Sequence, residues 1–124
     1  MLPFSRVAII GLGLIGSSVA RGVREAMPGV ALSGYDADPE VRETARALAL
    51  TDDVADSAGA AVIGADLVLL CVPVGAMGAV AADFAADLPA DAVVTDVGSC
   101  KESVATALAK ALPGATIIPA HPVA

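Results

Sequence analysis

Short apolar runs alternate along the chain with longer segments in which apolar residues recur every three or four positions. The short runs predict buried β-strands, and the longer segments predict helices with one buried face. Strands are expected at residues 6–10, 30–35, 67–72, 92–96 and 115–118, with at most a short further strand near Val54 that leads into a helical turn. Helices are expected at residues 14–27, 39–50, 75–87 and 102–112.

This alternation predicts an α/β fold in a single domain covering residues 1–124. Strand–helix–strand units pack as parallel strands with right-handed crossovers, so the expected architecture is a Rossmann doubly wound parallel sheet. For six strands the expected order is 3-2-1-4-5-6. The carboxyl ends of the strands then lie at one edge of the sheet, which is where ligands bind in open α/β sheets.

A glycine-rich turn, Gly-x-Gly-x-x-Gly, joins the first strand to the first helix. The first glycine permits a tight turn, the second lets the backbone approach a pyrophosphate, and the third lets the helix pack against the strand. The free N–H groups at the start of the helix would face the phosphates. The sequence therefore predicts a dinucleotide site, whose candidate residues in this turn are Gly11, Gly13, Leu14, Ile15 and Gly16.

Asp36 stands at the end of the second strand, about twenty positions after the last of these glycines. Its carboxylate can accept hydrogen bonds from a ribose 2′-hydroxyl and would repel a 2′-phosphate, so the expected cofactor is NAD rather than NADP. Asp38 is expected to cap the next helix, which begins at Pro39. Arg42 is the nearest basic residue downstream, and we expect it to face solvent from within that helix.

Three other segments follow strand ends and carry candidate site residues. Val72 and Pro73 end a buried strand; they terminate it, form a rigid wall beside the ribose and nicotinamide, or do both. Ser99 either caps the next helix, in a capping box with Glu102, or donates a hydrogen bond to substrate or nicotinamide. His121, the single histidine, follows the last strand, where a neutral imidazole could accept the proton of a hydroxyl being oxidised. The candidate catalytic residues are therefore Ser99 and His121.

Composition narrows the possible partners. The chain is 56% hydrophobic but only 2% aromatic, which suits an aliphatic core of helices on a parallel sheet. A net charge of −7 and few aromatic side chains argue against nucleic-acid binding. The longest uncharged run, residues 67–82, is too short to cross a bilayer, and the N-terminus has no signal-peptide pattern. Cys71 and Cys100 form no CxxC pair and are interpreted as thiols of a cytoplasmic protein, with no metal site.

Five segments, in order, resemble the N-terminal half of the prephenate/arogenate (cyclohexadienyl) dehydrogenases, the TyrA family. They are VAIIGLGLIGSS (7–18), GYD (34–36), CVPV (71–74), TDVGSCK (95–101) and HP (121–122). The resemblance covers essentially the whole chain. The segments around Ser99 and His121 are its most specific part, because NAD domains in general lack them.

This resemblance implies oxidative decarboxylation of prephenate to 4-hydroxyphenylpyruvate, or of arogenate to tyrosine, in tyrosine biosynthesis. Hydride would pass from C4 of the ring to nicotinamide as CO₂ leaves and the ring becomes aromatic. By the same resemblance, His121 would hydrogen-bond the ring 4-hydroxyl and Ser99 would orient His121 or the substrate. The glycines and Asp36 would hold NAD, and the full-length protein would be a homodimer.

The chain departs from the family at two points. Ala120 stands where a glycine usually precedes the His-Pro pair, and the helical domain that closes over the substrate in the family does not follow Ala124. Prephenate is a dianion that needs Arg or Lys clamps, and of the seven basic residues only Lys101 is expected near the ligand edge. We therefore expect the isolated chain to bind NAD and to turn over little substrate.

Two other interpretations remain open at this stage. The chain could be the cofactor domain of another NAD(P)-dependent hydroxyacid or imine oxidoreductase. It could also be a non-catalytic NAD-sensing module, which would need the glycine turn and Asp36 but would have no use for His121.

Overall fold

The computed structural model of the chain describes residues 4–96 and 108–117. Within these residues six parallel strands form one sheet in the order β3-β2-β1-β4-β5-β6, which confirms the predicted topology. The strands are β1 (Arg6–Ile10), β2 (Ala31–Tyr35), β3 (Asp53–Val54), β4 (Leu67–Leu70), β5 (Val93–Asp96) and β6 (Thr116–Ile117). Neighbouring β1 and β4 carry the switch in strand order, so the crevice between their carboxyl ends is the expected ligand position.

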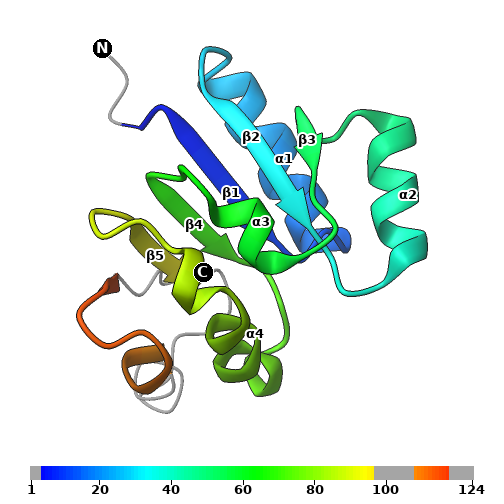
Figure 1. Ribbon diagram of the computed structural model, residues 1–124. Coiled ribbons are helices and arrows are strands. Elements are labelled where there is room, and N and C mark those ends of the chain that lie inside the picture. The colour runs from blue at the N-terminus through cyan, green and yellow to red at the C-terminus, as the bar shows by residue number, and fades with distance from the viewer. Residues whose placement is uncertain (1–3, 97–107, 118–124) are drawn as a thin grey trace, which may run out of the picture.

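Helices cover both faces of the sheet (Figure 1). One face carries α1 (Leu14–Ala26) and α2 (Pro39–Leu48); the other carries α3 (Ala58–Val62) and α4 (Met77–Phe84). Single 3₁₀ turns, η1 (Val74–Ala76) and η2 (Ala85–Asp87), flank α4, and residues 108–111 are helical as well. The fold is therefore a three-layer α/β arrangement of Rossmann type.

The core is split by the sheet into two aliphatic halves. Alternate residues of β1 point to opposite faces: Val7 and Ile9 pack toward α1 and α2, and Ala8 and Ile10 pack toward α3 and α4. Phe84 is the one buried aromatic side chain among the described residues. Because both faces are covered, the inner strands are apolar on both sides, which is why they appear in the sequence as continuous apolar runs.

Several predicted element boundaries move by one or two residues. The β4 ladder ends at Leu70 rather than at residue 72, although the Cys71 N–H still donates to the Ile10 carbonyl at 2.7 Å. The predicted helix 75–87 is an eight-residue α4 between two 3₁₀ turns, and no side chain caps its start. The short strand near Val54 and the helical turn after it are both present, as β3 and α3.

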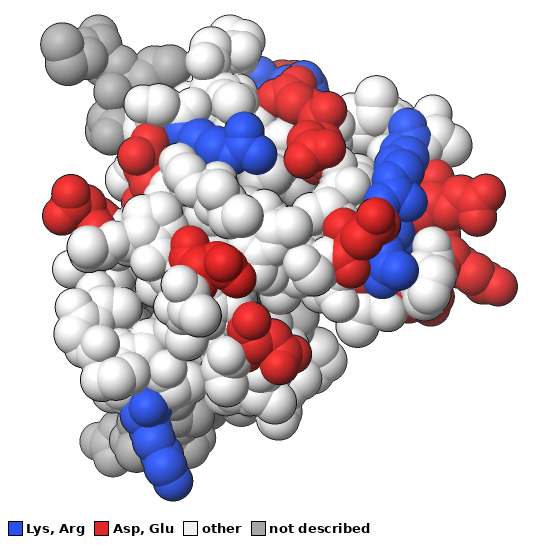
Figure 2. Space-filling view, in the orientation of Figure 1, with Lys and Arg blue, Asp and Glu red and all other residues white. Residues whose placement is uncertain are grey.

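The charged surface fits the exclusions drawn from composition. Acidic side chains are scattered over the face in Figure 2, with fewer basic ones between them. Such a surface repels polyanions rather than attracting them. In the described part of the chain, no helix combines the length and the apolar character that crossing a membrane requires.

Candidate cofactor site at the carboxyl edge of the sheet

The three glycines of the turn differ in what surrounds them. Gly11 has φ +100°, and a Cβ there would lie 2.6 Å from the Cys71 carbonyl oxygen, so only glycine fits this turn. A Cβ on Gly16 would overlap the Gly11 carbonyl oxygen, because α1 starts directly against the turn. A Cβ on Gly13 would meet nothing within 4 Å, which leaves its outer side open to a ligand. The turn is thus closed on the protein side and open on the ligand side.

The start of α1 is suited to binding an anion. Its N-cap is Gly13, no side chain caps it, and its first turn carries no acidic residue. Leu14 and Ile15 are 87% and 58% exposed, so they lie on the open side of the helix start. The buried residues of α1 are Gly16 and Ala20. The unpaired N–H groups and the helix dipole favour a phosphate at this position.

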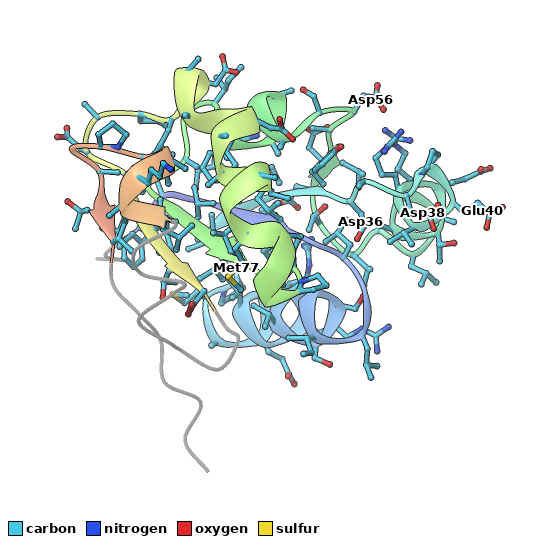
Figure 3. All side chains as sticks on the ribbon, turned by 90° about the horizontal axis from the view of Figure 1, so that it is seen from below. Asp36, Asp38, Glu40, Asp56 and Met77 are labelled. Carbon is cyan, nitrogen blue, oxygen red and sulfur yellow. The ribbon has the colours of Figure 1, made fainter. Side chains whose placement is uncertain are left out.

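Asp36 lies beside the glycine turn at the end of β2, where sequence reasoning placed it. Its Oδ2 accepts a hydrogen bond from the Leu12 N–H at 2.8 Å, and its Oδ1 accepts one from the Asp38 N–H at 2.9 Å. Figure 3, which looks onto this edge, shows Asp38 and Glu40 next to Asp36 at the start of α2. A carboxylate can accept about four hydrogen bonds, so two acceptor positions remain for ribose hydroxyls.

Arg42 does not face solvent, contrary to expectation. Its side chain is only 16% exposed, and its guanidinium donates to the carbonyl oxygens of Asp36 and Ala37 at 2.8 and 3.3 Å. The same group lies 5.6 Å from the centre of the Tyr35 ring. A planar guanidinium can stack and donate at once, which explains why this long side chain folds back on the strand end. Arg42 therefore holds the backbone that carries Asp36.

The strand end at Val72 and Pro73 lies against the glycine turn. A Cβ on Gly11 would come within 2.9 Å of the Val72 side chain, while Pro73 is exposed. Cys71, just before them, is a half-buried free thiol, and burial raises its pKa to about 11. The thiol is therefore protonated at physiological pH, so Cys71 acts as an apolar packing group under the turn.

Sequence reasoning missed Ser17. Its hydroxyl donates to the Leu12 carbonyl oxygen at 3.0 Å, which ties the first turn of α1 back to the glycine turn. A serine in the first turn of a helix is ordinarily a solvent-facing residue, so its sequence position gives no sign of this contact.

A second residue to which sequence reasoning gave no role is Asp96. It ends β5 with only 2% exposure, and its Oδ1 has no hydrogen-bond partner among the described residues. A buried carboxyl group at this edge of the sheet sits close to the predicted ligand side.

The two candidate catalytic residues, Ser99 and His121, lie outside the described residues, and so does Lys101. Within the described ranges, no cluster of three or more His, Cys, Asp or Glu side chains could hold a metal ion.

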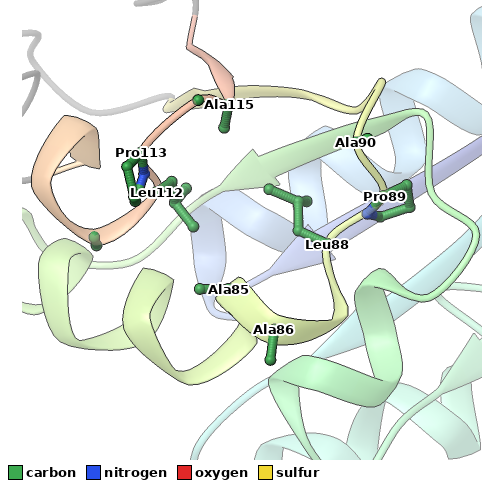
Figure 4. A pocket seen from close by; sticks show the side chains of 10 residues that line it. Ala85, Ala86, Leu88, Pro89, Ala90, Leu112, Pro113 and Ala115 are labelled. Carbon is green, nitrogen blue, oxygen red and sulfur yellow. The ribbon is translucent and has the colours of Figure 1, made fainter.

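Two hollows mark the described surface. The larger, about 530 Å³, lies at the opposite, amino edge of the sheet, between η2 and the turn before β6 (Figure 4). Its lining side chains are all apolar, so none of them can pair with a phosphate or accept from a ribose hydroxyl. The smaller, about 320 Å³, is a groove between α1 and α2 beside the glycine turn, lined among others by Leu12, Ser17 and Asp38. The residues that line the smaller groove, rather than the volumes of the two hollows, therefore identify the carboxyl edge of the sheet as the candidate site.

Comparisons with known proteins point to the same kind of site. Residues 19–124 match the family described as prephenate dehydrogenase, nucleotide-binding domain. The chain is 52% identical over 124 residues to the cyclohexadienyl dehydrogenase of Zymomonas mobilis subsp. mobilis, an alignment that covers 100% of this chain and 42% of the relative.

Solved structures of similar proteins lead to the same family as the sequence comparisons. Prephenate dehydrogenase from A. aeolicus, in complex with hydroxyphenyl propionate and NAD⁺, superposes with a TM-score of 0.86 at 30% identity, covering 98% of this chain and 43% of that one. Synechocystis arogenate dehydrogenase gives a TM-score of 0.82 at 28% identity, over 94% of this chain and 40% of that one. The chain thus spans about two fifths of the length of these relatives.

Proposed function

Because the chain belongs to the family of prephenate dehydrogenase nucleotide-binding domains, we propose that it binds NAD as the cofactor half of a prephenate or arogenate dehydrogenase. The observation that carries this proposal is the shape of the glycine turn. Its N–H groups at the start of α1 are uncapped, and its outer side at Gly13 is open. Asp36 stands beside it with acceptor positions left for a ribose.

NAD, rather than NADP, fits the residues around Asp36. Three carboxylates, those of Asp36, Asp38 and Glu40, lie between the end of β2 and the first turn of α2. Arg42 is the basic group nearest to them along the chain, but its guanidinium is held by backbone carbonyls and is not directed at a 2′-phosphate. A doubly charged 2′-phosphate would meet net negative charge there, whereas ribose hydroxyls would find acceptors.

A thermal-shift measurement tests the choice of cofactor. NAD at about 100 times its Kd should stabilise the fold by about 2.7 kcal/mol and raise the unfolding midpoint by roughly 10 °C. NADP at the same concentration should raise it much less. Equal shifts with the two cofactors would contradict the assignment to NAD, and no shift with either would contradict cofactor binding.

For the chemistry, we propose His121 and Ser99 as the catalytic residues. NAD, when bound, would supply the acceptor for the hydride that leaves C4 of the cyclohexadienol ring. His121 would accept a hydrogen bond from the 4-hydroxyl, and this bond would stabilise the positive charge that develops on C4. The bond to the ring carboxylate then breaks, CO₂ leaves, and its electron pair completes the aromatic ring. The hydroxyl keeps its proton, so the balance is one hydride transferred and one CO₂ released.

The 124 residues alone are proposed to bind the cofactor without substantial turnover. Prephenate carries two carboxylates that need cationic partners. Three of the six described basic residues are already engaged: Arg24 and Arg46 pair with Asp52 and Asp56, and Arg42 holds backbone carbonyls. With the Zymomonas mobilis enzyme as positive control, the chain should show NAD binding but little prephenate-dependent NADH formation. Turnover comparable to that control would overturn this proposal.

Two further properties are proposed on the family resemblance alone: a homodimeric full-length enzyme and a cytoplasmic location. Light scattering of the purified full-length protein tests the first, and fractionation of the producing cells tests the second. A monomer, or recovery outside the cytoplasmic fraction, would contradict them.

A further inference from the structure

Leu12 is the residue of the glycine turn that the protein holds most firmly. Its side chain is 3% exposed and packs in the core under α1 and α2. Its N–H donates to the Asp36 carboxylate at 2.8 Å, and its carbonyl accepts from the Ser17 hydroxyl at 3.0 Å. The residue is thus anchored by its side chain and by both of its backbone polar groups.

These anchors come from three separate elements. Asp36 follows β2, Ser17 belongs to the first turn of α1, and the core contact comes from the face shared by α1 and α2. The neighbouring Gly11 N–H also donates to the Tyr35 carbonyl, at 2.7 Å. The peptides just before Gly13 therefore have no freedom to reorient, and the N–H groups that follow them keep one direction.

We propose that Ser17 is a positioning residue for the pyrophosphate: with Asp36 it clamps Leu12 from both sides and presets the glycine turn for the cofactor. The inference rests on the proposed NAD binding. Ser17 acts through Leu12, because its hydroxyl proton is already donated to the Leu12 carbonyl oxygen. A turn that is already in its binding conformation loses less conformational entropy when the ligand binds, so the clamp raises affinity.

The chain provides a matched control for this idea. Ser18 is the next residue of α1; it is exposed and makes no side-chain hydrogen bond to any described residue. Ser17→Ala and Ser18→Ala each remove one hydroxyl group from the same turn of the helix, and neither changes the charge. Ser17→Thr keeps the hydroxyl, and the added methyl group has room in the groove of about 320 Å³.

The test is calorimetric titration of the wild-type chain and the three variants with NAD and with ADP, well below the unfolding temperature. Ser17→Ala should weaken both ligands by a similar factor, about three- to tenfold, because the lost contact acts on the turn that both pyrophosphates share. Ser18→Ala should bind like wild type, and Ser17→Thr should recover most of the loss.

The inference is overturned if Ser17→Ala binds NAD as tightly as wild type, if Ser18→Ala loses as much, or if Ser17→Thr fails to recover binding. A purely stabilising role for Ser17 would lower the unfolding midpoint and leave affinity unchanged, which is the first of these results. If the wild-type chain binds neither NAD nor ADP, the proposed function itself fails, so the two failures are distinguishable.

Discussion

At the scale of single residues, the same added methyl group is expected to affect NAD affinity at Gly13 and stability at Gly16. Gly13→Ala should fold normally, because a Cβ there meets no protein atom within 4 Å and φ is −71°, but its affinity for NAD should fall at least tenfold. Gly16→Ala should lose about 1–3 kcal/mol or more of stability, because its Cβ overlaps the Gly11 carbonyl. Urea unfolding and NAD titration of both variants measure the two effects. Unchanged NAD affinity in Gly13→Ala would count against a pyrophosphate at this turn.

Cys71 gives a second prediction at this scale. Burial raises its pKa to about 11, so at pH 8 only ~0.1% of the thiol is ionised, against ~25% for an ordinary cysteine. In a Cys100→Ser variant, alkylation by iodoacetamide should be roughly a hundredfold slower than that of a free thiol at pH 8. The rate should climb with pH and level off only above about 11. Rapid alkylation at pH 8 would show that the thiol is not buried.

Single residues also show where sequence reasoning reaches its limit. Gly11, Gly16 and the Asp38 cap were predictable because local backbone geometry demands those residue types. Asp36 was predictable because a ribose needs an acceptor at that distance along the chain from the glycine turn. Arg42 and Ser17 were not, because their partners are carbonyl oxygens that any residue could supply. From sequence alone, a long or hydroxyl-bearing side chain on a helix is expected to face solvent. Only the folded structure shows that a backbone carbonyl oxygen lies within hydrogen-bonding distance of it.

At the scale of elements, two carboxylates tie strands together and predict acid sensitivity. Asp66, just before β4, accepts from the N–H groups of Ser5 and Arg6 at 2.6 and 3.0 Å, and these hydrogen bonds lower its pKa. The Leu32 N–H, with help from Arg24, likewise lowers the pKa of Asp52. A carboxylate whose pKa is lower in the folded state stabilises the fold at pH values above its unfolded-state pKa of about 3.9. This stabilisation is lost as the pH falls through the folded-state pKa.

We therefore expect the free energy of unfolding to fall as pH drops from about 5 to below 4. Asp66→Asn should make this acid slope shallower and should lower stability at pH 7. Asp91→Asn is the matched control, since Asp91 is exposed and makes no side-chain hydrogen bond to a described residue. Urea titrations at several pH values measure the slope; the same slope in Asp66→Asn and wild type would contradict the assignment.

The elements themselves were largely predictable, whereas their ends were not. Buried parallel strands need apolar residues on both faces, so β1, β4 and β5 are visible as runs in the sequence. The end of β4 at Leu70 depends on where the pairing with β1 and β5 stops, which is a property of three segments together. The start of α4 likewise lacks a capping side chain, so no local signal marks it.

At the scale of the whole molecule, the main prediction concerns His121. A chimera can join these 124 residues to the remainder of the Zymomonas mobilis enzyme, with which they share 52% identity. In that chimera His121→Asn should lower kcat by about 10²- to 10⁴-fold while the Kd for NAD stays within about twofold, because the imidazole acts on the ring hydroxyl and not on the cofactor. Ala120→Gly, which restores the residue usual in the family, serves as the neighbouring control. Unchanged kcat in His121→Asn would remove the histidine from the mechanism.

The two outermost strands have a consequence for behaviour at high concentration. Within the described residues, the sheet is bounded by β3 on one side and β6 on the other, each of two residues. Unpaired edge strands are templates for aggregation, and short or charged edges are how natural sheets suppress it. On the β3 side, an edge of two residues that bears Asp53 offers almost no ladder for another molecule to extend. At this edge the apolar inner strands of a chain that is 56% hydrophobic lie behind β3, and this protects the chain from fibre-like self-association.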